Sequence, residues 1–363
     1  MANYMDELHY WSEKESLWKN LKGSTIMISG ATGMIGKCLV DLFMMYNAGT
    51  VPCQTSESQD TGVKVIALSR NESSARERLG DYWDSPWFQY VSCDVNAAVP
   101  ECGRVDYIIH AASNTHPRLY SQDPIGTIAS NVFGTKNLLD YGVSHGIRQF
   151  CFVSSVEVYG ENRGDTEKFD ESYLGFLDCN TLRAGYPESK RLGEALCNAY
   201  GEACGMGFVI PRLSRVYGPT MLMSDTKAIS QFLKKAAAGE DIVLKSEGNQ
   251  KYSYAFVTDA AAGILWTMVF GALKEAYNVA DEQSDITLKG LAEILAGIGG
   301  SKVVFELPEE RERKGYSTAT RAMLSTEKIR ALGWEARIHM KEGLLQTVEA
   351  WKREAAAITD IQV

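Results

Sequence analysis

Two stretches of the chain place a lysine four residues after a tyrosine. One is "YPESK", with Tyr186 and Lys190, and the other is "YWSEK", with Tyr10 and Lys14. Residues four apart lie on one face of a helix, so the ammonium group can lie beside the phenol. An adjacent cation favours the ionised phenol, which can then take a proton from a hydroxyl group. Such pairs also arise by chance in a chain with 17 tyrosines, so the surrounding segments must decide between them.

A glycine-rich turn separates an apolar strand pattern from a helical pattern. "STIMISG" predicts a strand, and "ATGMIGKCLVDLFMMY" predicts the helix that follows it. Gly30, Gly33 and Gly36 form the spacing G-x-x-G-x-x-G at the junction. Glycines let the backbone approach a pyrophosphate closely, and the helix N-terminus supplies N–H groups and a positive dipole end. In this context the turn predicts a dinucleotide-binding site.

Strand and helix patterns alternate along the first 210 or so residues. The remaining strand patterns of this part are "VKVIALSR", "FQYVSCDV", "VDYIIHAA", "QFCFVSS" and "GFVIPRLS", and the helical patterns are "TIASNVFGTKNLLDYGVSHG" and "AGYPESKRLGEALCNAYGEACG". Continuously apolar strands are typical of parallel strands buried on both faces. The sequence therefore predicts the α/β class, with a Rossmann-type doubly wound parallel sheet and a smaller mixed α/β C-terminal substrate lobe.

These patterns divide the chain into three parts. We expect an amphipathic N-terminal helix over residues 1–21 and the NAD(P)-binding Rossmann domain over residues 22–218. Residues 219–363 are expected to form the substrate-binding lobe. Within the lobe, we expect the last strand of the sheet near 253–259. "YWSEK" falls on the leading helix, with no apolar strand before it, so Tyr10 and Lys14 are interpreted as part of a solvated helix face.

Composition limits the classes of partner. The net charge of −9 argues against a nucleic-acid partner, because phosphate backbones require clustered lysine and arginine. No signal-peptide pattern and no apolar run of 18 residues is present, so we expect no membrane partner. The eight cysteines form no C-x-x-C pair and the five histidines are scattered. We therefore expect reduced thiols, a cytoplasmic location and no metal site.

Six further motifs follow the glycine turn in order: "CDV", "HAAS", "NVFGTKNL", "SSVEVYG", "YPESK" and "PRLSRVYGP". With the turn, they resemble the extended short-chain dehydrogenase/reductases, the NAD-dependent epimerase/dehydratase family, over most of the chain. The nearest branch resembles UDP-glucuronate decarboxylases and sugar 4,6-dehydratases. The resemblance implies a nucleotide-sugar substrate, and it selects Tyr186 and Lys190 over the pair on the leading helix.

The resemblance assigns roles to residues at the matching positions. Those implied in catalysis are Ser155, Glu157, Tyr186 and Lys190. Those implied in cofactor binding are Gly30, Thr32, Gly33, Met34, Ile35, Gly36, Ser69, Arg70, Asp94, Val95, Ala111, Ala112, Ser113, Asn131, Ser154, Tyr186, Lys190 and Pro211. Those implied in substrate binding are Thr115, Ser155, Tyr159, Arg215 and Tyr252. Pro187 disfavours helical geometry at the preceding residue, so we expect Tyr186 at the very start of its helix.

Three positions depart from the pattern of the family. Val156 stands where the dehydratases carry an acid beside the catalytic serine, and it can transfer no proton. Tyr252, in "GNQKYSY", stands where the family motif has an arginine that is implicated near the sugar acid of decarboxylases. Arg215, in "PRLSRVYGP", replaces the usual asparagine and suits a nucleotide diphosphate. The first departure weakens a dehydratase assignment and the second a decarboxylase assignment.

The end of the second strand bears on the choice of cofactor. NAD-specific members usually place an acid there to hold the ribose hydroxyls. Here the strand ends "ALSRN", and Ser69 and Arg70 can accept a 2′-phosphate instead. The sequence thus favours NADP over NAD.

Three functions remain open. The first is modification of a nucleotide-activated sugar by transient C4 oxidation, which covers epimerases, dehydratases and decarboxylases. The second is a net NADPH-dependent reductase of a nucleotide-linked or free keto sugar. The third is a non-catalytic NAD(P)-binding protein, against which the intact Ser155, Tyr186 and Lys190 argue. The resemblance also implies a homodimer formed through residues 127–145 and 184–204.

Overall fold

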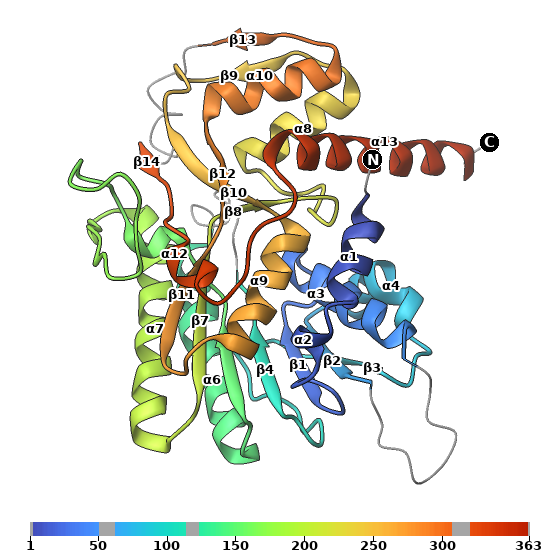
Figure 1. Cartoon of the computed structure of the whole chain (residues 1–363), viewed down its shortest axis with the longest axis vertical. Coiled ribbons are helices and arrows are strands. Elements are labelled where there is room, and N and C mark those ends of the chain that lie inside the picture. Colours follow the sequence, from blue (N-terminus) through green and yellow to red (C-terminus); the bar gives the residue numbers. More distant parts are fainter. Residues whose placement is uncertain (1–2, 51–61, 114–122, 307–319, 362–363) are drawn as a thin grey trace.

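The glycine turn joins the first strand of a parallel sheet to a helix that covers one of its faces. The computed structural model describes residues 3–50, 62–113, 123–306 and 320–361 (Figure 1). The strands of the main sheet are β1 (Thr25–Ser29), β2 (Lys64–Ser69), β3 (Phe88–Ser92), β4 (Tyr107–His110), β5 (Gln149–Phe152), β6 (Ser154–Ser155), β7 (Phe208–Leu213) and β11 (Glu275–Val279).

The strand order is β11-β7-β5-β4-β1-β2-β3, with β6 also paired to β7, and every pairing is parallel. The central strands β1 and β5 are buried along their whole length, which explains their continuously apolar sequences. Their carboxyl ends lie at one edge of the sheet, where doubly wound folds bind ligands. The predicted fold class is confirmed.

Helices cover both faces of this sheet. On one face, α3 (Met34–Ala48) and α9 (Val257–Phe270) share a hydrophobic core with β1 and β2. On the other, α6 (Pro124–His145) and α7 (Gly185–Cys204) pack against each other and share a second core with β4, β5 and β7. Shorter helical segments are α4 (Glu72–Leu79), η1 (Gly80–Tyr82), η2 (Val156–Tyr159) and η3 (Leu182–Ala184).

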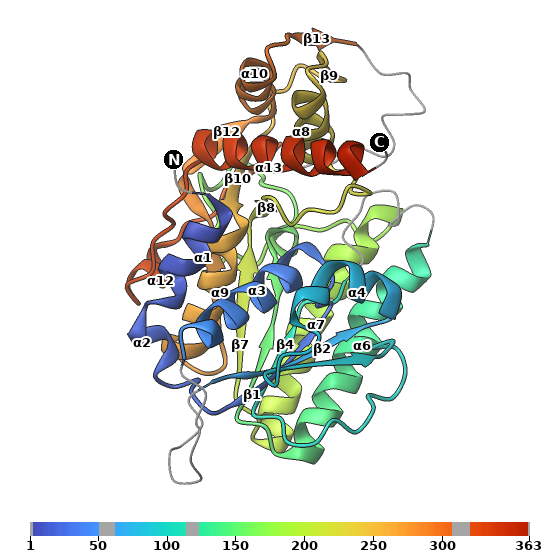
Figure 2. The same ribbon diagram turned by 90° about the vertical axis from the view of Figure 1, so that its right-hand side faces the viewer.

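The lobe lies beyond the carboxyl ends of the strands, at the top of Figure 1. Its elements are β8 (Arg215–Tyr217), α8 (Ala228–Ala238), β9 (Ile242–Leu244), β10 (Lys251–Phe256), β12 (Asp281–Thr287), α10 (Leu288–Gly299), β13 (Val303–Phe305), β14 (Arg321–Ala322) and α13 (Met340–Ile361). The short helix α12 (Glu327–Arg330) instead packs on β11 of the main sheet. A four-stranded sheet joins β8, β10, β12 and β14, and β9 pairs with β13. Helix α13 runs between the lobe and the Rossmann domain (Figure 2).

The predicted position of the last sheet strand is wrong. The stretch near 253–259 spans the end of β10 and the start of α9, and β10 pairs with β8 and β12 in the lobe. The strand that completes the main sheet is β11, which pairs with β7. The chain therefore crosses from the lobe back to the Rossmann domain at Phe256–Val257, and α9 and β11 belong to that domain.

The N-terminal segment is two helices instead of the predicted one. Helix α1 (Tyr4–Ser12) begins at a capping box between Asn3 and Asp6, and α2 (Glu15–Trp18) follows a non-helical Lys14. The break turns the second helix so that Trp18 is also buried, and its indole N–H donates to the carbonyl of Trp11 at 3.0 Å.

Candidate active site

The glycine turn lies at the carboxyl end of β1, against the end of β4. Gly30 has a φ of +72°, and a Cβ added there would lie 2.7 Å from the Cα of Ala112. A Cβ on Gly36 would lie 2.2 Å from the Gly30 carbonyl oxygen. Helix α3 then begins at Met34 with no side-chain cap on its first N–H groups. The turn is thus a backbone cradle at a helix N-terminus, which fits the pyrophosphate of a dinucleotide.

The other predicted residues of the turn lie around this cradle. Thr32 lies between β1 and α3, Ile35 lies in the first turn of α3, and the carbonyl of Met34 accepts from the Thr220 hydroxyl at 3.0 Å. Gly33 donates its N–H to the Gly30 carbonyl at 2.9 Å. This bond closes the turn, and the hydroxyl contact ties it to the loop that enters the lobe.

Tyr186 is the second residue of α7, which confirms its expected position at the start of a helix. Helix α7 continues from η3, so the chain is already helical before Pro187. Lys190, one turn later, is buried and donates from Nζ to the Val153 carbonyl at 2.9 Å. The pair therefore lies against the carboxyl end of β5. Tyr10 instead lies on α1, with its ring 3.3 Å from the guanidinium carbon of Arg337.

Burial dominates the ionisation of the catalytic pair. It raises the pKa of the Tyr186 phenol above its usual value, although side-chain hydrogen bonds with Ser155 and Ser113 oppose this shift. Burial also lowers the pKa of Lys190 to about 8, while the Glu194 carboxylate raises it. Burial thus decides the direction of the pKa shift at both residues, and the prediction that Lys190 favours the ionised phenol stays a prediction.

A chain of hydrogen bonds fixes the backbone of Tyr186 from the side of α6. The Ser113 hydroxyl donates to Asn131 Oδ1 at 2.7 Å, and Asn131 Nδ2 donates to the Ser189 hydroxyl at 2.8 Å. Ser189 in turn donates to the Tyr186 carbonyl at 2.8 Å. Asn131 is fully buried, so this predicted cofactor residue acts here by joining β4, α6 and α7.

A second buried chain lies beneath the glycine turn. His110 contacts the Ser29 hydroxyl through Nδ1 at 2.7 Å and the Thr135 hydroxyl through Nε2 at 3.1 Å. Burial, with the Lys190 charge, lowers the pKa of His110 to about 3. The ring is therefore neutral at physiological pH and acts as a hydrogen-bonding spacer between β1, β4 and α6.

Ser154 and Pro211 were predicted at the cofactor, and Tyr159 at the substrate. In the structure all three are held by contacts within the protein, around the guanidinium group of Arg212, and we call this set of contacts the framework. The Ser154 hydroxyl donates to Glu194 Oε1 at 2.6 Å, and Pro211 is buried opposite Tyr277 in the main sheet. Tyr159 has no exposed surface, and its hydroxyl donates to Asn278 Oδ1 at 2.7 Å. Direct substrate contact by Tyr159 is therefore a wrong prediction for this arrangement.

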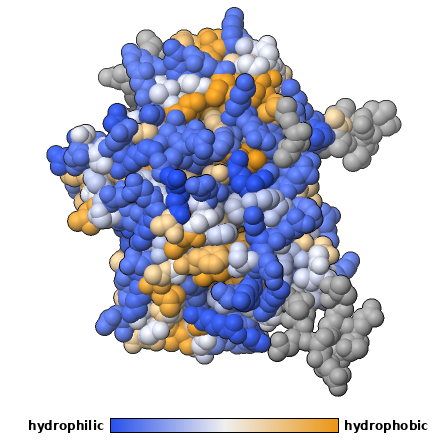
Figure 3. Space-filling view, viewed as in Figure 1, coloured by the Kyte–Doolittle hydropathy of each residue, from blue (hydrophilic) through white to orange (hydrophobic). Residues whose placement is uncertain are grey.

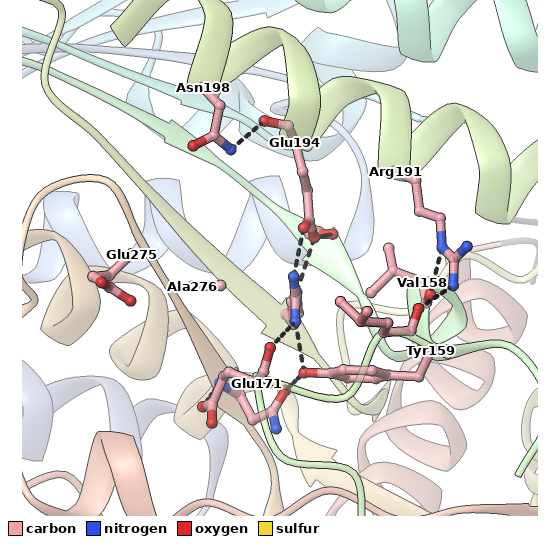
Figure 4. A network of polar contacts seen from close by, with 12 residues as sticks. Val158, Tyr159, Glu171, Arg191, Glu194, Asn198, Glu275 and Ala276 are labelled. Carbon is pink, nitrogen blue, oxygen red and sulfur yellow. Dashed lines mark hydrogen bonds and ion pairs between the residues drawn. The ribbon is translucent and has the colours of Figure 1, made fainter. Parts of the chain in front are cut away.

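Arg212 is the centre of this framework, and the sequence patterns did not single it out. It donates twice to the Glu194 carboxylate, at 2.7 and 3.0 Å, once to the Tyr159 hydroxyl at 2.9 Å and once to the Glu171 carbonyl at 3.1 Å. Figure 4 shows Glu194 and Tyr159 directed toward this one guanidinium group from α7 and η2. Glu194 follows Lys190 by four residues, so helical spacing could have found it.

Glu157 lies beside Ser155, whose hydroxyl accepts from the Glu157 N–H at 3.3 Å. Its carboxylate pairs with Arg183 at 3.2 Å and with Arg215 at 3.4 Å. The Arg215 guanidinium carbon lies 3.8 Å from the centre of the Tyr252 ring. The structure thus joins three predicted residues to Arg183, which the sequence reasoning missed.

The residues predicted at the adenosine end lie along the same edge of the sheet. Ser69 ends β2 with a buried hydroxyl that has no partner among the described residues, and Arg70 is exposed. Asp94 follows β3 and caps the Asn96 N–H at 3.0 Å, while Val95 packs on Gly134. Ala111 and Ala112 face the glycine turn from the end of β4. Thr115 lies outside the described residues.

Other site classes find no support in the described part of the chain. It contains no cluster of three or more metal-ligating side chains. Its seven cysteines are free thiols. No described helix is both long enough and apolar enough to cross a membrane.

The fold and the site define a dinucleotide-binding α/β protein with a Ser–Tyr–Lys constellation at the carboxyl edge of a parallel sheet. The pattern of the NAD dependent epimerase/dehydratase family matches residues 26–280. The chain belongs to this family and is one of its enzymes.

Named relatives agree with this assignment. A UDP-glucuronic acid decarboxylase 1 from Xenopus tropicalis is 28% identical over 333 residues, which cover 91% of this chain and 72% of the relative. A UDP-glucuronic acid decarboxylase 5 from Arabidopsis thaliana is 28% identical and covers 88% of this chain and 86% of its own length.

Among solved structures, a dTDP-glucose 4,6-dehydratase from Streptomyces venezuelae with NAD bound is similar at a TM-score of 0.74 and 25% identity, over 92% of this chain and 98% of that one. A UDP-glucose 4-epimerase from Thermotoga maritima matches at a TM-score of 0.77 and 20% identity, over 91% and 99% of the two chains. The second likeness shows the fold alone.

Proposed function

We propose that the protein oxidises C4 of a nucleotide-linked sugar transiently and then reduces it again, and that the reaction in between is decarboxylation of a uronic acid. The observation that carries the oxidation is the convergence of Ser155, Tyr186 and Lys190 at the carboxyl edge of the sheet. The cradle at Gly30 fits the dinucleotide that such a cycle requires. The names of the two decarboxylase relatives support the choice of reaction.

Each residue of the constellation has a role in this chemistry. The Ser155 hydroxyl holds the C4 hydroxyl of the sugar by a hydrogen bond, and Tyr186 takes the proton of that hydroxyl. Lys190, one helical turn after Tyr186 on α7, would hold the ribose of the cofactor and supply a positive charge to the site. A bound oxidised dinucleotide supplies the hydride acceptor and a positive ring that further favours the ionised phenol.

Decarboxylation follows from the position of the ketone. A uronic acid oxidised at C4 is a β-keto acid, because its carboxylate is attached to C5. The C5–C6 bond breaks, CO2 leaves, and the electron pair of that bond moves into an enolate on the C4 oxygen, which a proton at C5 then quenches. Elimination of a C6 hydroxyl instead needs an acid beside Ser155, and Val156, which is buried, supplies none.

The test is turnover of UDP-glucuronic acid labelled with ¹³C at C6. The proposal expects labelled CO2, a UDP-pentose product and no net consumption of added dinucleotide. The Tyr186→Phe variant should release no CO2. Consumption of NADPH in proportion to product would instead establish the net reductase, and a C4 epimer that retains the label would establish an epimerase.

The form of the cofactor and the oligomeric state are parts of the same proposal. The exposed Arg70 and the unpartnered Ser69 hydroxyl favour NADP, whereas the dehydratase neighbour contains NAD. The mass of the dinucleotide released from denatured protein distinguishes them. The free thiols are in keeping with the cytoplasmic location that we propose.

We propose a homodimer through α6 and α7. Four apolar side chains of α6 and one of α7 are exposed: Ile125, Ile128, Phe133, Val143 and Leu192. Exposed apolar side chains on two helices that pack together mark an association surface. Figure 3 also shows apolar surface on the Rossmann half of the face that it presents. Light scattering after size-exclusion chromatography tests the proposal, and Phe133→Glu should give monomers.

A further inference from the structure

An acid and two arginines form a cluster beside the catalytic serine. Glu157 lies two residues after Ser155, in η2, and its carboxylate pairs with Arg183 from η3 and with Arg215 from β8. All three side chains are partly exposed, between 21% and 30%. The cluster therefore adjoins the reacting position and keeps a surface that a ligand can contact.

The charges of this cluster do not balance. Two guanidinium groups face one carboxylate, and in the described part of the chain no second acid pairs with Arg183 or Arg215. Burial lowers the pKa of Arg215, but Glu157 and Tyr252 raise it, and the net direction is upward. The cluster thus carries one positive charge beyond what Glu157 neutralises. A partly buried excess charge of this kind favours an anionic ligand.

The excess positive charge is carried by a different strand from the one that carries an arginine in the family pattern. That pattern has an arginine where Tyr252 stands and an asparagine where Arg215 stands. In the structure, β8 and β10 are adjacent, and Arg215 stacks on the Tyr252 ring at 3.8 Å. The cation missing from β10 is therefore replaced by one on the neighbouring strand, and the aromatic ring supports its planar face.

The geometry of a pyranose decides which anion the cluster can contact. In the proposed function Ser155 holds the C4 hydroxyl. The C6 group is attached to C5, next to C4, whereas the diphosphate is attached to C1, across the ring. Glu157 adjoins Ser155 directly and pairs with both arginines, so of the two anionic groups of the ligand the one at C6 is closer to the cluster.

Resting on the proposed function, we infer that Arg183 and Arg215 recognise the C6 carboxylate of a nucleotide-linked uronic acid, with Glu157 positioning both. The carboxylate accepts charge-assisted hydrogen bonds from the two guanidinium groups and balances their excess charge. The two arginines are then the residues that distinguish a uronic acid from the corresponding neutral sugar.

The test compares two ligands that differ only at C6. Binding of UDP-glucuronic acid and of UDP-glucose is measured by calorimetry in the Tyr186→Phe variant, so that neither ligand is turned over. We expect UDP-glucuronic acid to bind about tenfold more tightly or better. Adding Arg215→Gln or Arg183→Gln should reduce this preference to about twofold, while the affinity for UDP-glucose stays unchanged.

Matched variants distinguish an effect of the charge of the arginines from an effect on the fold of the protein. Arg163→Gln removes an exposed arginine that stacks on Phe176 outside the cluster, and it should leave the preference intact. Arg215→Lys keeps the charge and should keep part of the preference. Glu157→Gln removes the only acid of the cluster and should increase the preference for the uronic acid.

Two outcomes would overturn the inference. Equal affinity of the parent protein for both ligands would show that the cluster does not recognise C6. The second outcome is that Arg215→Gln loses affinity for both ligands equally, while its melting temperature is unchanged and the dinucleotide is retained. That result would assign Arg215 to the diphosphate instead. The proposed function fails separately, if neither UDP-sugar binds or if the protein with Tyr186 intact releases no CO2 from UDP-glucuronic acid.

Discussion

Replacing Glu194 by glutamine should reveal how the charged framework supports the catalytic lysine. Glu194 accepts two hydrogen bonds from Arg212 and one from Ser154, and it lies one helical turn after Lys190. Its side chain is 12% exposed and that of Arg212 is 14% exposed. The substitution keeps the shape of the side chain and removes its charge.

The expected loss of stability is large. Removing one partner of a buried ion pair costs about 3 to 5 kcal/mol, because the other charge stays buried without compensation. Arg212 keeps its bonds to the Tyr159 hydroxyl and the Glu171 carbonyl, and the pair is slightly exposed. We therefore expect a loss of about 3 kcal/mol in the free energy of unfolding, measured in urea.

The substitution should also move the pH dependence of turnover. Burial lowers the pKa of Lys190 to about 8, and the Glu194 carboxylate opposes this shift. Without that carboxylate the ammonium form of Lys190 is less favoured, so the pKa of Lys190 falls. The alkaline limb of the pH profile, where Lys190 loses its proton, should then begin at lower pH, in a turnover assay from pH 6 to pH 10.

Glu202→Gln is the matched control, because Glu202 lies on the same helix and its side chain is 90% exposed. It should change the free energy of unfolding by less than about 0.5 kcal/mol and leave the pH profile in place. An alkaline limb in Glu194→Gln that coincides with that of the parent protein would refute the electrostatic link to Lys190. An unchanged free energy of unfolding in Glu194→Gln would refute the stabilising role assigned to the ion pair of Glu194 and Arg212.

Three further predictions concern single positions. Tyr186→Phe should abolish turnover and leave the bound dinucleotide in place, as judged by mass after denaturation; residual turnover would contradict its role as the base. Gly30→Ala should lose the dinucleotide because its Cβ meets Ala112, whereas Gly146→Ala, which has a φ of +60° and open space around it, should lose only about 1 to 2 kcal/mol of stability. Burial raises the pKa of Asp259 to about 7, so the native state holds an extra proton and stability should fall as pH rises from about 4 to 7. Asp259→Asn should flatten that slope in unfolding experiments, and a slope that persists would assign it to another group.

The sequence predicted the parts of the structure that depend on neighbouring residues. Alternating strand and helix patterns predicted the order of the main elements, since a buried parallel strand must be apolar on both faces. The glycine turn was predicted because its steric demand is local: a Cβ on Gly36 would meet the Gly30 carbonyl. Tyr186 at the start of α7 was predicted from the proline that follows it.

The same patterns could not predict contacts between distant segments. Arg183 and Arg215 meet Glu157 only because η3 and β8 converge on η2, across separations of 26 and 58 residues. The strand near 253–259 was misplaced for a similar reason. An apolar run of that length suits either sheet, and only the pairing of β10 with β8 and β12 assigns it to the lobe.

Arg212 and Arg215 lie three residues apart, where the chain leaves the main sheet for the lobe, and their surroundings explain why we assign them different roles. Arg212 has a bidentate carboxylate, a phenol and a carbonyl as acceptors, so its hydrogen-bonding capacity is largely used within the protein. Arg215 has one carboxylate contact at 3.4 Å and the face of an aromatic ring, so it keeps donors for a ligand. A neutralised arginine stabilises the fold, whereas an incompletely neutralised one beside the catalytic serine is suited to binding. The Glu194 and Glu157 variants should therefore differ in kind: the first should lose stability and the second should change ligand preference.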